Sequence, residues 1–281
     1  MKLENNKNVI ITGCSSGIGY ATALKLNNEG YNVFATCRTE KDIKKIRKLG
    51  IKSIFLDYSN EKSIVKASKY ILNKFNNNIY ALFNNGAYAL PGALEDIPSQ
   101  ALREIIETNL IGYHTLNRLI IPSMRKNGYG KIIHCSSVLG FISLPFRGAY
   151  NTSKWALEGY SDTLRLELDG TGINVISIRP GPINTKIKEN SINHFEKWIN
   201  WEKSSFNKLY LNKILPRLYK NNKVDRFELE PEVVANIVFK ILKNKNPSFT
   251  YNVTLPSHIG ELLNRILPKR ILQKLILKIY S

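Results

Sequence analysis

Near its N-terminus the chain reads Asn8-Val-Ile-Ile-Thr-Gly-Cys-Ser-Ser-Gly-Ile-Gly19, an apolar run followed by three glycines and the start of a helical pattern over residues 18–28. The order of strand, glycine turn and helix is the context that a nucleotide-binding fingerprint needs. Glycines let the backbone approach a pyrophosphate, and the amides at a helix N-terminus receive its negative charge. The segment therefore predicts a dinucleotide site, although its spacing is G-x-x-x-G-x-G rather than the more common G-x-G-x-x-G.

Further short apolar runs alternate with helical patterns along the chain. The expected strands are residues 8–12, 31–36, 53–56, 79–83, 131–135, 173–178 and 251–253. Apolar residues at i, i+3 and i+4 predict helices between them, among others over residues 61–75, 100–125 and 151–168. Such alternation indicates an α/β fold, and we expect a single domain over residues 1–281. Its core would be a Rossmann-type doubly wound parallel sheet of about seven strands with helices on both faces.

Two segments break this rhythm. Residues 186–230 follow the sixth expected strand and are rich in Lys, Asn and aromatic residues, which predicts a helical insertion. Such excursions are often lids over a substrate, and the alternative is a pair of surface helices whose aromatic residues only pack. Residues 259–281 alternate apolar and basic side chains, which predicts an amphipathic helical tail that rests on the domain, on a second subunit or on a membrane surface.

Composition narrows the class of protein. The formal charge is +19, but basic residues are interspersed with Glu and apolar residues along the whole chain, which argues against a nucleic-acid partner. No stretch reaches the roughly 18 uninterrupted apolar residues of a membrane span, and residues 1–7 leave no room for the apolar region of a signal peptide. Three widely spaced cysteines favour a chain with reduced thiols in the cytoplasm, where peripheral membrane contact is possible. The four histidines are scattered without the spacing of metal ligands, so we expect no metal site.

A second motif carries candidate acid–base chemistry. Ser137 precedes Tyr150-Asn-Thr-Ser-Lys154, and a helix from residue 151 would place the phenol and the amine one turn apart on one face. A fixed cation beside a phenol favours the phenolate, so we expect Lys154 to lower the pKa of Tyr150 and Ser137 to bind the reacting oxygen. Taken alone, Tyr and Lys at this spacing are more often a packed ring beside a solvated amine.

The end of the second expected strand bears on cofactor choice. In the common fingerprint an acidic residue about 20 positions after the glycines accepts a hydrogen bond from the ribose 2′-hydroxyl. Arg38 stands at that strand end, and an arginine cannot accept this bond but can pair with a 2′-phosphate. NADP(H) is therefore the preferred cofactor. NAD(H) stays open because Glu40 and Asp42 lie nearby in the sequence.

Together these motifs resemble the classical short-chain dehydrogenase/reductase family over about residues 9–185. Thr12 and the glycines look like its cofactor turn, and Asp57 resembles its adenine-contacting acid. The segment Asn84-Asn85-Gly86-Ala87 is similar to the family's N-N-A-G motif with the last two residues inverted. The segment Arg179-Pro-Gly-Pro-Ile-Asn-Thr185 looks like the one that closes over the nicotinamide, with Thr185 on its carboxamide.

The resemblance implies a set of site residues. Its catalytic tetrad would be Asn109, Ser137, Tyr150 and Lys154, in which Asn109 holds a water that relays protons to the lysine. The expected cofactor-binding residues are Gly13, Ser15, Ser16, Gly17, Ile18, Gly19, Arg38, Asp57, Asn85, Gly86, Tyr150, Lys154, Pro180, Gly181, Ile183 and Thr185. No tetrad position is substituted in this sequence.

The function that the resemblance implies is NADP(H)-dependent interconversion of a carbonyl and an alcohol by hydride transfer, with Tyr150 as general acid/base. A weaker likeness to the hydroxysteroid/retinol dehydrogenase branch favours a small hydrophobic substrate. The expected apolar pocket wall is Tyr88, Ala89, Leu90, Leu139, Phe141, Leu144, Phe146 and Ile183. Relatives usually form homodimers or homotetramers. The alternatives are a non-catalytic NADP-binding redox-sensing regulator of the same fold, an epimerase or dehydratase of this family, and a peripheral membrane or nucleic-acid binding module.

Overall fold

The computed structural model describes residues 7–219 and 226–280, so that residues 220–225 of the expected insertion and Ser281 of the tail lie outside it. Its centre is one parallel sheet with the strand order β3-β2-β1-β4-β5-β6-β7. The strands are β1 (Asn8–Ile11), β2 (Asn32–Cys37), β3 (Lys52–Phe55), β4 (Ala81–Asn84), β5 (Gly130–Cys135), β6 (Ile173–Arg179) and β7 (Thr250–Asn252). The order reverses between β1 and β4, which confirms the predicted doubly wound Rossmann-type sheet.

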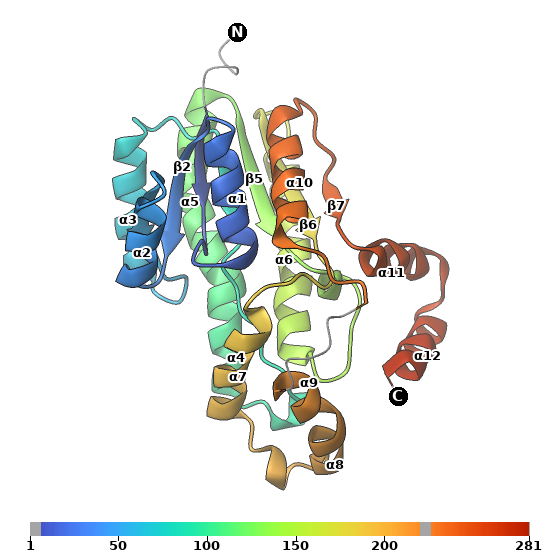
Figure 1. The fold of residues 1–281 in the computed structure, drawn as a ribbon. Helices are drawn as coiled ribbons and strands as arrows, with labels where there is room; N and C mark the ends of the chain where they lie inside the picture. Colours follow the sequence, from blue (N-terminus) through green and yellow to red (C-terminus); the bar gives the residue numbers. More distant parts are fainter. Residues whose placement is uncertain (1–6, 220–225, 281) are drawn as a thin grey trace.

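Helices cover both faces of this sheet (Figure 1). Val9 and Ile11 of β1 point into a core beneath α1 (Gly17–Asn28), α2 (Glu40–Arg47) and α10 (Pro231–Lys243). Ile10 points into the opposite core beneath α3 (Glu61–Lys74), α5 (Gly112–Asn127) and α6 (Gly148–Glu167). The strands read as continuous apolar runs because both of their faces are buried.

The expected helix over residues 100–125 is interrupted. It is divided into α4 (Ser99–Ile106), a π-helical turn (Glu107–Ile111) and α5. A π-helical turn inserts one extra residue and is frequent at functional sites. It carries Asn109, which is fully buried. Helix α2 is an addition to the expected helices, and the hydroxyl of Thr39 caps it by accepting a hydrogen bond from the Asp42 backbone amide at 3.1 Å.

The insertion after β6 is helical, as predicted. Its described part holds α7 (Ile187–Trp198), a 3-10 turn (Trp201–Lys203), α8 (Asn207–Leu209), a π-helical turn (Tyr210–Ile214) and α9 (Leu215–Tyr219). Phe195 and Tyr210 are buried in a cluster that also includes Ile105 of α4 and Ala149 of α6. These aromatic side chains therefore hold the insertion against the domain.

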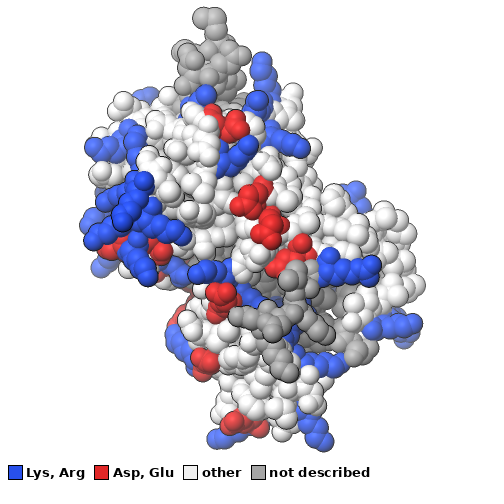
Figure 2. Space-filling model, in the orientation of Figure 1, with Lys and Arg blue, Asp and Glu red and all other residues white. Residues whose placement is uncertain are grey.

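The tail forms two helices, α11 (Leu255–Ile266) and α12 (Lys269–Tyr280), at the side of the molecule (Figure 1). The expected single amphipathic run is broken at Pro268, which has no backbone N–H to continue a helix. No helix among the described residues is long and apolar enough to cross a bilayer. On the face shown in Figure 2, Lys and Arg side chains are spread over the surface, with Asp and Glu between them.

Candidate active site

A cleft of about 1490 Å³ at the carboxyl ends of the central strands brings most of the predicted site residues together. It lies where the strand order reverses, the usual place for ligands in such sheets. The predicted residues that line it are Gly13, Ser15, Ser16, Gly17, Ile18, Arg38, Asp57, Asn85, Gly86, Ser137, Tyr150, Lys154, Pro180, Gly181, Ile183 and Thr185. Gly19 and Asn109 are buried behind the wall of this cleft.

The glycine turn is shaped by close approaches between loops. Gly13 and Gly17 have φ angles of +67° and +56°, which L-residues with side chains rarely adopt. A Cβ at Gly13 would lie 2.6 Å from the Gly86 Cα, and a Cβ at Gly17 would lie 2.9 Å from the Thr185 Cγ2. At Gly19 a Cβ would lie 2.3 Å from the Gly13 carbonyl oxygen, so this glycine lets the turn pack on α1. Three separate loops thus meet around one narrow space.

Asn85 ties the glycine turn to the loop after β4. Its Nδ2 donates hydrogen bonds to the carbonyl oxygens of Thr12 at 3.0 Å and Gly13 at 3.3 Å. The Thr12 hydroxyl accepts from the Asn85 backbone N–H at 2.9 Å and from the Tyr58 hydroxyl, also at 2.9 Å. Asn85 therefore positions the turn, and Tyr58 is a supporting residue that sequence reasoning missed.

Arg38 is exposed at the end of β2, beside the glycine turn. No residue that the structure describes forms an ion pair or hydrogen bond with its guanidinium. Asp42, one of the two acids that left NAD(H) open, accepts a hydrogen bond from the Thr39 hydroxyl at 2.7 Å. The carboxylate of Asp57 accepts from the Ser59 backbone and hydroxyl at 3.0 and 2.9 Å.

Tyr150 and Lys154 lie one turn apart on α6, as predicted, and both are buried. The Lys154 ammonium donates a hydrogen bond to the Cys135 carbonyl oxygen at 2.6 Å and lies 5.7 Å from the centre of the Tyr150 ring. Ser137, two positions after the end of β5, accepts a hydrogen bond from the Leu139 backbone at 3.1 Å. A hydroxyl, a phenol and an amine thus face the cleft from two elements.

The electrostatics of this trio differ from the sequence-based expectation. Burial raises the pKa of Tyr150, the neighbouring Cys135 raises it further, and hydrogen bonding to Ser137 opposes the rise. Burial lowers the pKa of Lys154 to about 8, against the opposing effect of Cys135 and Glu158. The expected lowering of the Tyr150 pKa by Lys154 is therefore wrong for this arrangement, because desolvation dominates. At neutral pH the phenol is protonated and most of the Lys154 amine is charged.

Asn109 is held by backbone groups of the β4 loop. Its Nδ2 donates to the Tyr88 carbonyl oxygen at 2.9 Å and to the Ser153 hydroxyl at 3.1 Å. Its Oδ1 accepts from the Tyr88 backbone N–H at 3.1 Å. These bonds fasten α6 and the π-helical turn to the cleft wall, and the water relay to Lys154 stays a prediction.

Four of the eight residues that we expected in the apolar pocket wall line the cleft. Ala89, Leu139, Leu144 and Ile183 line the cleft, and Ile187, Ile214 and Leu218 of the insertion add to it. Tyr88, Leu90, Phe141 and Phe146 do not line it, because they are packed inside the protein. The Tyr88 ring stacks on His194 of α7, with the ring centres 3.8 Å apart. It connects the wall to the insertion.

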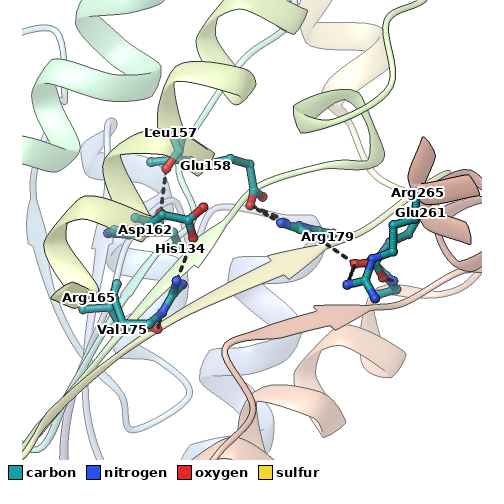
Figure 3. A network of polar contacts seen from close by, with 11 residues as sticks. His134, Leu157, Glu158, Asp162, Arg165, Val175, Arg179, Glu261 and Arg265 are labelled. Atoms are coloured by element: carbon teal, nitrogen blue, oxygen red, sulfur yellow. Dashed lines mark hydrogen bonds and ion pairs between the residues drawn. The ribbon is translucent and has the colours of Figure 1, made fainter. Parts of the chain in front are cut away.

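Besides Tyr58, two further supporting residues escaped the sequence analysis. Cys135 acts through its backbone carbonyl, for which a sequence carries no signal. Glu158 lies one helical turn after Lys154, and its carboxylate accepts from Arg179 Nη2 at 2.6 Å (Figure 3). That i+4 spacing was visible in the sequence and could have identified Glu158.

Comparison with known proteins agrees with this geometry. Residues 7–195 match the short chain dehydrogenase family. The uncharacterized oxidoreductase YbbO of Escherichia coli is 35% identical over 96% of this chain and 94% of its own. Retinol dehydrogenase 16 of Mus musculus is 32% identical over 79% of this chain and 72% of its own, in line with the branch that the sequence resembles.

A solved structure extends the likeness to the whole fold. A short chain dehydrogenase from Burkholderia cenocepacia, in complex with NADP, superposes with a TM-score of 0.75. Its sequence is 20% identical, and the match covers 100% of both chains. The chain described here therefore belongs to the short-chain dehydrogenase/reductase family of oxidoreductases, enzymes that act on CH–OH groups and their carbonyl counterparts.

Proposed function

We propose that this enzyme interconverts a carbonyl and an alcohol on a small hydrophobic substrate with NADP(H), and that Tyr150 is its general acid/base. One observation carries the proposal. Ser137, Tyr150 and Lys154 line the same cleft as the glycine turn and Arg38. A proton-transfer group and a dinucleotide cradle therefore share one space, which hydride transfer requires.

The residues around the glycine turn fit a nicotinamide dinucleotide, which supplies the hydride when bound. The positive φ angles of Gly13 and Gly17 open the turn, and the first turn of α1 has no acidic residue to repel a pyrophosphate. Arg38 offers a guanidinium to a 2′-phosphate, and no described residue holds that group elsewhere. Solved structures of the same fold hold NADP or NAD, which supports a nicotinamide dinucleotide, and the preference for NADP(H) is argued from Arg38 alone.

The titration of the site residues favours carbonyl reduction. Reduction adds a hydride to the carbonyl carbon and a proton to its oxygen. Tyr150 is protonated at neutral pH because burial raises its pKa, so it can donate that proton. Ser137 donates a hydrogen bond to the same oxygen, and the charged Lys154 stabilises the phenolate that remains.

Apolar side chains line part of the cleft, although charged side chains such as Lys186, Glu189 and Arg217 line it too. Leu139, Leu144 and Ile187 line the apolar part, and the described helices of the insertion, which contribute Ile214 and Leu218, are proposed to act as its lid. The name of the mouse relative, retinol dehydrogenase, supports a lipophilic alcohol or carbonyl. We also propose that the chain forms one domain and assembles as a homodimer or homotetramer, as the family resemblance implies.

A panel screen tests this function. NADPH absorbance is followed with water-soluble ketones and aldehydes and with long-chain or cyclic lipophilic ones. The Ser137→Ala variant, purified from the same host, controls for contaminating reductases. We expect kcat/KM to be at least about tenfold higher for lipophilic carbonyls than for their short analogues. NADPH binding without turnover on any compound would overturn the proposal.

A further inference from the structure

Helix α11 exposes an unbroken apolar stripe. Leu255, Ile259, Leu262 and Ile266 follow one another at i, i+4, i+7 and i+11, which places them on one face. Their exposed fractions lie between 47 and 66%. Soluble proteins rarely leave such a contiguous row of large aliphatic side chains in water without a binding role.

Helix α12 repeats the pattern and adds charge. Ile271, Leu275 and Ile279 form a second stripe at i, i+4 and i+8, with exposed fractions from 40 to 87%. A basic residue precedes each of them by one position, and these are Arg270, Lys274 and Lys278. A row of cations thus borders the row of aliphatic side chains. No acidic residue follows Glu261 in the sequence.

The opposite side of the tail is fastened to the domain (Figure 3). The Glu261 carboxylate accepts from Arg179 Nη1 at 3.3 Å and from Arg265 Nη2 at 2.8 Å. Leu272 of α12 is buried against Phe141 and Ile142. These contacts occupy the inner faces of both helices, so the two apolar stripes are turned away from the domain. The option that the tail rests on its own domain is therefore right for its inner face, whereas the domain leaves the two stripes uncovered.

We propose that α11 and α12 bind an anionic lipid surface. In this arrangement the aliphatic stripes enter the boundary between headgroups and acyl chains, and the bordering cations reach lipid phosphates. At the right of Figure 2, where α11 and α12 project, the visible surface is white and blue. Charge favours this occupant over a second copy, because a symmetric contact of α12 with α12 would place Arg270 and Lys274 against like charges, and α12 has no acidic residue.

The lipid-binding surface borders the active-site cleft. Val138 and Leu144 line the cleft and also contact the cluster beneath α11 and α12. A protein seated on lipid through these helices would therefore hold one side of the cleft near the bilayer. The docking proposal stands on the tail alone and does not depend on the proposed reaction.

Vesicle co-sedimentation of the full chain tests the proposal. Phosphatidylcholine vesicles are compared with vesicles that also contain phosphatidylglycerol, at low and high salt. We expect about tenfold or more bound protein on the anionic vesicles at low salt, and a smaller difference at high salt. Equal binding to both compositions, or none, would overturn the proposal.

Matched variants identify the surface. Leu262→Asn with Ile266→Asn should reduce vesicle binding at least about fivefold, whereas Leu49→Asn with Leu166→Asn, at exposed leucines elsewhere, should not. Arg270→Gln with Lys274→Gln should weaken binding to anionic vesicles more than Lys62→Gln with Lys66→Gln, the same change at the same spacing on α3.

Wild-type binding by both tail variants would contradict the proposal. So would a loss of self-association in place of a loss of vesicle binding, which would assign the stripe to a second copy. Turnover of a water-soluble carbonyl without vesicles should be the same in all these variants. The vesicle assay therefore tests the lipid-binding proposal, and the turnover assay tests the enzymatic function independently of it.

Discussion

Arg179 binds Glu158 through two hydrogen bonds to one carboxylate oxygen, at 3.1 Å from Nε and 2.6 Å from Nη2. Both side chains are nearly buried, with exposed fractions of 13 and 9%. The pair joins the end of β6 to α6, one turn after Lys154 (Figure 3). It therefore fixes the helix that carries Tyr150 and Lys154 to the strand that leads into Pro180 and Gly181.

Removal of Arg179 should be costly. Arg179→Ala leaves the Glu158 carboxylate buried and uncompensated, and such a loss lowers the free energy of unfolding by about 3–5 kcal/mol. Arg265→Ala is the control, because that guanidinium is 74% exposed and its pair with Glu261 is worth about 1 kcal/mol or less. Urea denaturation of both variants measures the two losses in free energy of unfolding. Similar losses would show that the Arg179–Glu158 pair stabilises the fold no more than an exposed ion pair does.

The stability of the protein should depend on the charge of Lys154. Its pKa in the folded protein is about 8, below the value of about 10.4 in an unfolded chain. The unfolded state therefore binds more protons between about pH 8 and pH 10.4, so stability rises with pH across this window. The buried charge destabilises the fold at pH 7 by about 3 kcal/mol, and loss of the hydrogen bond to Cys135 offsets about 1 kcal/mol, so Lys154→Met should raise the free energy of unfolding there by about 2 kcal/mol.

The advantage of Lys154→Met should disappear above about pH 10.4, where the lysine is neutral in both states. Urea titrations at neutral and alkaline pH measure this. A variant that is less stable than wild type at pH 7 would contradict the depressed pKa.

Arg38 should decide cofactor preference. Arg38→Asp removes the proposed partner of a 2′-phosphate and adds a repulsive charge, so NADPH binding should weaken by about 10- to 100-fold. NADH binding should change by less than about threefold, because NADH has no such phosphate. Fluorescence titration with both cofactors measures the two effects, and Lys41→Asp, at an exposed neighbouring position, controls for the general loss of charge. Equal losses for both cofactors would remove Arg38 from the phosphate site.

Tyr210 should anchor the lid. Its buried hydroxyl accepts from the Ala93 backbone N–H at 2.7 Å and donates to Asp96 Oδ2 at 2.8 Å. Tyr210→Phe leaves the Ala93 amide without this acceptor, which costs about 1–3 kcal/mol of stability. We expect KM for the carbonyl substrate to rise severalfold with little change in kcat. Tyr219→Phe, at a largely exposed hydroxyl of the same insertion, should alter neither quantity. An unchanged KM in Tyr210→Phe would separate the insertion from substrate binding.

The strands and the glycine turn could be predicted because burial on both faces leaves a plain signal. Val9, Ile10 and Ile11 read as one apolar run since each side of the sheet is covered. The cleft followed from the same logic, because residues that come directly after parallel strands meet at one edge. Arg38 and Asn85 are such residues, Ser137 follows its strand one position later, and the structure brings the three together.

Other features depend on three-dimensional surroundings that the sequence does not encode locally. The pKa of Tyr150 is set by desolvation from several elements, and the i+4 lysine alone predicts the opposite direction. The π-helical turn holds Asn109, whose amide binds the Tyr88 backbone, a contact between segments 21 positions apart. Tyr88 was expected in the pocket wall, yet its ring stacks on His194, far along the chain.

The direct test of the central claim is the turnover of Tyr150→Phe on a carbonyl that the wild-type enzyme reduces, with NADPH affinity measured on the same preparation. This change removes one oxygen from a buried ring and leaves Lys154 and the glycine turn in place. If Tyr150 supplies the proton, kcat should fall by about 10²- to 10⁴-fold while the dissociation constant of NADPH changes by less than about twofold. Turnover close to that of the wild type, with NADPH bound normally, would contradict the account.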